Sequence, residues 1–154
     1  MNKKCFAIIL LLLMIIAGGT YKFIFQGNVS KSSDGRTSIL LSADERDLVL
    51  AEMRLFLISV QKINTAIAED NMPLAAEAAR KVGKAAQGEV PGTLIGKLPL
   101  LFKQLGFATH SKFDQLAMDL EDLGDANHSL SQLSALMHNC VTCHETYRID
   151  LENQ

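Results

Sequence analysis

The fold class is indicated most clearly by residues 126–149, ANHSLSQLSALMHNCVTCHETYRI. Apolar side chains recur there every three or four residues, which is the spacing of one face of an α-helix. They are Leu130, Leu133, Leu136, Met137, Cys140 and Val141. No strand pattern competes with this helical pattern along the chain. We therefore predict a last helix that carries Cys140, Cys143 and His144 in its final turns.

Three more helices are predicted before this one. The first covers residues 43–69, because Ser42 and Glu45 have the spacing of a capping box, in which each side chain binds the other residue's backbone amide. The second covers residues 72–86 and the third covers 108–123, and a glycine closely follows each of them.

The segment between the second and third helices is predicted to be mostly irregular. Residues 88–99, GEVPGTLIGKLP, contain two prolines and three glycines, which favour a loop with about one helical turn. Residues 98–106 are predicted to form a short helical piece. Four helices with mostly short connections favour an all-α fold, an antiparallel up-down-up-down four-helix bundle over residues 42–151.

Residues 1–25 have the pattern of a signal peptide or of a membrane anchor. Two lysines precede the apolar run at 5–17, and small residues before Thr20 offer a cleavage point. Apolar character then resumes, so residues 5–25 are also long enough to span a bilayer. Both alternatives stay open, and both send the C-terminal domain out of the cytoplasm. Residues 26–41 are rich in Ser, Gly and Asn and are interpreted as a linker.

Composition narrows the classes of function. The 154-residue chain has a net charge of −2 and therefore lacks the basic field of a nucleic-acid-binding protein. Its three cysteines are Cys5, Cys140 and Cys143, and the last two belong to a C-x-x-C-H run, the attachment signature of c-type haem. A redox dithiol needs a strand–helix context, and a zinc site needs a second ligand pair. We therefore favour covalent haem, with His144 as the proximal iron ligand.

Residues 140–148, Cys-Val-Thr-Cys-His-Glu-Thr-Tyr-Arg, extend this signature. With the predicted helices, the chain resembles the class II c-type cytochromes, the cytochrome c-prime family, over about residues 42–151. The resemblance implies one haem c bound through Cys140 and Cys143, with Arg148 beside the proximal histidine. It also implies export to the bacterial periplasm and, in many members, a homodimer formed through the first helices.

The far side of the haem distinguishes two branches of the family. In an up-down-up-down bundle the first and last helices are antiparallel neighbours, so a partner for His144 comes from the first turns of helix one. Met53 lies there, and we expect it as the distal iron ligand, in a pocket walled by neighbouring side chains. These are Leu48, Val49, Phe56 and Leu57. The alternatives are that Met53 fills the core, or that His110, otherwise a surface or capping residue, approaches the iron.

The sequence accordingly predicts a one-electron carrier rather than an enzyme. No catalytic residues are expected, and the expected partners are redox proteins. A five-coordinate haem protein that binds nitric oxide or carbon monoxide is the alternative, if Met53 does not ligate the iron. A third hypothesis is a structural helical bundle that binds no haem.

Overall fold

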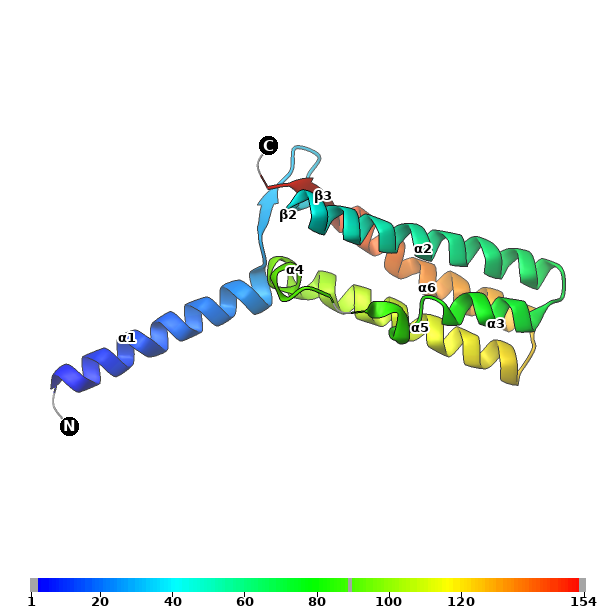
Figure 1. The fold of residues 1–154 in the computed structure, drawn as a ribbon, viewed down its shortest axis with the longest axis horizontal. Coiled ribbons are helices and arrows are strands. Elements are labelled where there is room, and N and C mark those ends of the chain that lie inside the picture. The colour runs from blue at the N-terminus through cyan, green and yellow to red at the C-terminus, as the bar shows by residue number, and fades with distance from the viewer. Residues whose placement is uncertain (1–2, 89, 153–154) are drawn as a thin grey trace.

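A computed structural model describes residues 3–88 and 90–152 of the chain (Figure 1). An N-terminal helix, α1 (Lys3–Thr20), continues into a turn of π-helix, η1 (Tyr21–Gln26), and projects away from the rest of the molecule. The main helices that follow are α2 (Ala43–Ala68), α3 (Met72–Arg80), α5 (Leu100–Asp122) and α6 (Ala126–Thr146). Two shorter elements, η2 (Lys84–Gln87) and α4 (Gly92–Lys97), connect α3 with α5. The prediction of a mostly helical chain with an apolar N-terminal segment is confirmed.

Helices α2, α3, α5 and α6 share one apolar core, and we call α2–α6 the helical body. Helix α3 packs against both α2 and α5, and α5 packs against α6. Ile63 of α2, Phe113 of α5 and Leu136 of α6 are among the buried side chains of this helical core. The capping box at the start of α2 is present: the Ser42 side chain accepts from the Glu45 amide, and the Glu45 carboxylate accepts from the Ser42 amide.

Some helix boundaries differ from the predicted ones. The pieces expected at 98–106 and 108–123 form one helix, α5, because its two halves pack on separate apolar clusters and Gly106 does not interrupt them. Helix α3 ends at Arg80 rather than near residue 86, and the expected loop at 88–99 contains α4.

The expectation that no strands form is wrong, because the chain contains a small three-stranded sheet. Its strands are β1 (Val29–Lys31), β2 (Thr37–Leu41) and β3 (Tyr147–Leu151). Strand β2 lies in the middle, antiparallel to β1 and parallel to β3, with Ile39 opposite Ile149. Residues 26–41, expected as a linker, are thus part of the folded domain. Helix α6 stops at Thr146 instead of 149 because the chain after it pairs with β2.

A second apolar cluster lies between this sheet and the helical body, and we call it the sheet-end core. Its buried members are Ile39, Leu41, Val49, Leu94, Leu98, Phe102 and Tyr147. The ring of Tyr147 meets that of Phe102 edge to face, with centroids 5.5 Å apart. The cluster joins the start of α2, the end of α6 and the start of α5. The C-terminal strand and the exit of α1 therefore lie at the same end of the helices (Figure 1).

Candidate functional site

The two motif cysteines lie on α6, three residues apart and therefore on one side of the helix. Both are half-buried free thiols. Burial raises the pKa of Cys140, and burial together with the neighbouring Cys140 raises that of Cys143 to about 11. Both sulfurs are therefore neutral thiols at pH 7. Dithiol oxidoreductases need the opposite arrangement, in which the attacking cysteine has a lowered pKa.

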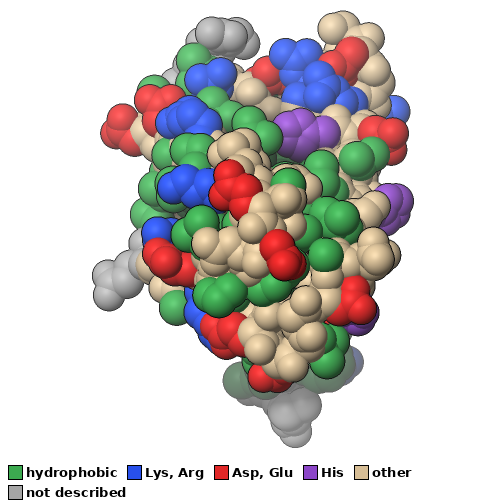
Figure 2. Space-filling model, turned by 90° about the vertical axis from the view of Figure 1, so that its right-hand side faces the viewer, with side chains coloured by type: hydrophobic (Ala, Val, Ile, Leu, Met, Phe, Trp, Pro, Cys, Tyr) green, Lys and Arg blue, Asp and Glu red, His purple; other side chains and the backbone are tan. Residues whose placement is uncertain are grey.

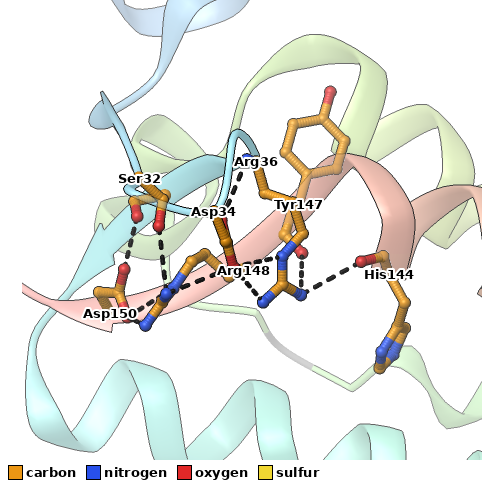
Figure 3. Close-up of polar contacts among 8 residues, drawn as sticks. Ser32, Asp34, Arg36, His144, Tyr147, Arg148 and Asp150 are labelled. Atoms are coloured by element: carbon orange, nitrogen blue, oxygen red, sulfur yellow. Dashed lines mark hydrogen bonds and ion pairs between the residues drawn. The ribbon is translucent and has the colours of Figure 1, made fainter.

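His144 follows directly and is exposed at the last turn of α6. Within the described part of the chain, its imidazole takes part in no hydrogen bond. Its backbone carbonyl, in contrast, accepts a hydrogen bond of 3.2 Å from the guanidinium of Arg36. Figure 3 shows the imidazole directed away from the polar cluster around Arg36 and Arg148. Both ring nitrogens are thus accessible to a ligand.

Met53 lies in the third turn of α2 and is partly buried. Its side chain packs against the sheet-end core, and Cys143 packs against the same cluster. The tertiary structure therefore brings the early turns of α2 and the motif turn of α6 to one apolar region, although Met53 and Cys143 are 90 positions apart in the sequence.

The residues expected around Met53 do not all face that region. Val49 is buried in the sheet-end core. Phe56 instead packs on the helical core and stacks on Phe113 at 5.5 Å. Leu48 and Leu57 are exposed, Leu57 to 70%. The expected pocket wall is therefore divided between two cores and the surface.

An open groove of about 660 Å³ runs along α6 beside α2. It is lined by side chains that include Asn64, Leu130, Met137, His138 and Val141. Val141 lies inside the C-x-x-C-H run, but Cys140, Cys143 and His144 are not among the residues that line the groove. Its volume is within the range of small-molecule and cofactor sites, about 300–1,000 Å³. Figure 2 shows the end of the helical body that lies away from α1, where hydrophobic side chains are exposed among charged ones.

The sequence predicted that His110, unless it approaches the iron, is a surface or capping residue. The structure shows that it is neither. It is 3% exposed, its Nδ1 lies 2.8 Å from the Val82 carbonyl, and its Nε2 lies 3.2 Å from a Glu52 carboxylate oxygen. Burial alone would lower the pKa of His110, but the hydrogen bonds to Glu52 and Val82 outweigh it and raise the pKa. Both ring nitrogens are therefore already engaged.

Arg148 is directed toward the β1–β2 turn (Figure 3). Its guanidinium donates to Asp150 at 2.8 Å and to Ser32 at 3.1 Å, and pairs with Asp34. Arg36 is instead the arginine that contacts the backbone of His144. Sequence reasoning missed Arg36, and the only local signal for it was the turn-forming Asp34-Gly35 pair before it.

Within residues 3–88 and 90–152, no three His, Cys, Asp or Glu side chains gather as a metal-binding cluster. Comparison with models of protein families, with curated proteins and with solved structures finds no match for this chain.

Proposed function

We propose that this protein is an exported c-type cytochrome that carries one electron at a time. Cys140 and Cys143 would hold the haem as thioethers, His144 would be the proximal iron ligand and Met53 the distal one. The observation that carries the proposal is the C-x-x-C-H run at the end of α6, with an exposed imidazole whose ring is not hydrogen-bonded within the described residues.

The surroundings of the motif fit this group. Met53 and Cys143 contact one apolar cluster. The buried side chains of this cluster keep water from one side of the motif, and Met53 would offer a soft thioether from the neighbouring helix. When bound, haem c supplies a one-electron couple between ferric and ferrous iron. The proposed fold is correspondingly an antiparallel four-helix bundle of α2, α3, α5 and α6, as in the class II cytochromes.

A second candidate function is binding of nitric oxide or carbon monoxide at an open distal position. One observation favours it: the Met53 side chain already packs against the sheet-end core. If Met53 stayed in that core when haem is attached, its sulfur would not hold the iron, and the group would be open to a small gas. The two functions therefore differ in whether the Met53 sulfur would bind the haem iron.

The visible spectrum of the dithionite-reduced protein, recorded before and after carbon monoxide is added, tests both functions. Electron transfer with Met53 ligation predicts a sharp low-spin spectrum that carbon monoxide leaves unchanged. Met53→Ala then becomes high-spin and reactive, while Met118→Ala, at an exposed position of α5, keeps the parent spectrum. A parent protein that reacts at once supports the gas-binding function instead.

Covalent attachment is tested separately by denaturing gels stained for haem. The parent chain and Cys5→Ser should retain the stain, because Cys5 lies on α1 outside the motif. Replacement of both Cys140 and Cys143 by Ser should remove it. A parent chain without covalent haem, produced in cells with haem-attachment machinery, contradicts both proposed functions.

A further inference from the structure

The segment that joins α1 to the helical body is tightly packed. Residues Lys3–Gln26 form one helix that is long and apolar enough to cross a membrane, by length and composition. Immediately after it, Gly27 has a positive φ of 71° and its Cα lies against the backbone of Lys97, Leu98 and Pro99. The Asn28 amide donates to the Lys97 carbonyl at 2.7 Å. The end of the apolar helix is therefore fixed on α4 rather than connected by a linker.

Two further contacts hold η1 itself against the body. The Lys103 ammonium of α5 donates to the Ile24 carbonyl at 2.9 Å and to the Ile95 carbonyl at 3.3 Å. The ring of Phe23 lies on Gly96 of α4, where an added Cβ would overlap it. These contacts are made by residues after the predicted cleavage point before Thr20, so they hold the joint in a cleaved and in a retained chain. In a retained chain they also fix the direction in which α1 leaves the body.

The side chains around this joint have the composition of a membrane interface. Tyr21, Phe23 and Phe25 of η1 and Ile95 of α4 are exposed, the three aromatic residues to 50% or more. Lys22 is exposed between the aromatic residues. Aromatic residues are enriched at the level of the lipid headgroups, and lysine is attracted to anionic lipids there. We call Tyr21, Lys22, Phe23, Phe25 and Ile95 the interfacial patch.

The joint also determines which end of the helical body lies nearest the patch. Lys97, the last residue of α4, pairs with Glu45 at the start of α2 and with Glu152 after β3. Strand β1 follows the joint and belongs to the sheet whose third strand directly follows α6. The motif end of α6 and the exit of α1 therefore share one end of the body (Figure 1).

We propose that α1 is retained as a membrane anchor and that the interfacial patch docks on the lipid headgroups, so that the body stands with its motif end toward the bilayer. The lipid surface is the occupant because the patch is continuous with an apolar helix of spanning length. A consequence, which rests on the proposed function, is that electrons are exchanged with a membrane-embedded redox partner.

Retention of the anchor is tested on the full chain expressed in cells. The intact mass of the protein should include residues 3–19, and the protein should stay in the membrane fraction after an alkaline carbonate wash. A mature chain that begins at Thr20, or one released by the wash, overturns the proposal.

Docking of the patch is tested with the retained protein in phosphatidylcholine–phosphatidylglycerol vesicles. The chain has no tryptophan, so Phe25→Trp provides a single probe in the patch. Phe107→Trp is the matched control, because Phe107 is exposed to a similar degree, 53%, but lies within α5. Brominated lipids should remove most of the fluorescence of Phe25→Trp and little of that of Phe107→Trp.

Equal quenching of both probes would mean that the body lies flat on the bilayer, and no quenching of either would mean that the patch stays in water. Both results overturn end-on docking. Because each probe is compared with itself in ordinary lipid, quenching by haem cancels. A failure here leaves the haem spectrum and the gel stain unaffected, so it is distinguishable from a failure of the proposed function.

Discussion

The guanidinium of Arg36 donates a hydrogen bond to the backbone carbonyl of His144, 108 positions later in the chain, and its Nη1 also lies 3.4 Å from the Tyr147 carbonyl. The last carbonyls of an α-helix have no partner within the helix. Arg36 therefore satisfies the end of α6 from the β1–β2 turn, where Asp34 holds its other nitrogens. Through this contact the N-terminal hairpin supports the turn that carries the motif.

Arg36→Ala should destabilise the protein by about 1–2 kcal/mol, because a hydrogen bond from a charged group to a helix end is lost. Urea unfolding followed by circular dichroism measures the change. Arg46→Ala is the control, since Arg46 pairs weakly with the exposed Asp47 at 3.9 Å, and should change stability by less than about 0.5 kcal/mol. Equal losses for the two variants would mean that the contact with His144 contributes nothing specific.

Ile39→Ala should reduce the free energy of unfolding by about 2–5 kcal/mol, because Ile39 is fully buried in the sheet-end core. Leu55→Ala serves as the comparison: Leu55 is 56% exposed on α2, so its truncation should have a much smaller effect. The same unfolding assay measures both. If Ile39→Ala behaved like Leu55→Ala, residues 26–41 would be a linker after all, as the sequence alone suggested.

Gly27→Ala should lower the melting temperature more than Gly35→Ala. Both glycines have a positive φ, which an alanine adopts with strain. Only at Gly27 does an added Cβ meet other atoms, the backbone of Lys97–Pro99, whereas nothing lies within 4 Å at Gly35. The difference between the two variants therefore isolates the packing of the joint below α1. Equal melting temperatures would show that this joint is loosely packed.

The buried His110 and its partly exposed partner Glu52 predict a particular pH dependence of stability. The pKa of His110 is raised in the folded protein above its ordinary value of 6.5. The pair therefore contributes fully below that pH, and its contribution is lost as the pH rises through the raised folded pKa. Thermal unfolding on both sides of pH 6.5 should show stability falling with rising pH.

Glu52→Gln provides the test of this sign. Without the carboxylate, burial favours the neutral imidazole, so the contribution of His110 should now grow as the pH rises. A variant with the same pH slope as the parent protein would place the titration on another group.

The helix starts were predictable because capping is local. Ser42 and Glu45 are three residues apart, and the predicted start at residue 43 agrees with α2. Asn71 similarly accepts a hydrogen bond from the Leu74 amide at the start of α3. At Gly106 the local signal misled, because packing of both halves of α5 outweighs the roughly 1 kcal/mol by which glycine disfavours helix.

The sequence by itself determined the motif, the mostly helical class and the apolar N-terminal helix, because each depends on residues a few positions apart. Only the tertiary structure decided that Thr37–Leu41 pairs with Tyr147–Leu151, that Arg36 meets His144, and that Met53 and Cys143 contact one core. A strand of five residues carries almost no periodic signal, and its partner lies more than 100 residues away. Such contacts form only when the whole chain packs, so no local sequence pattern predicts them.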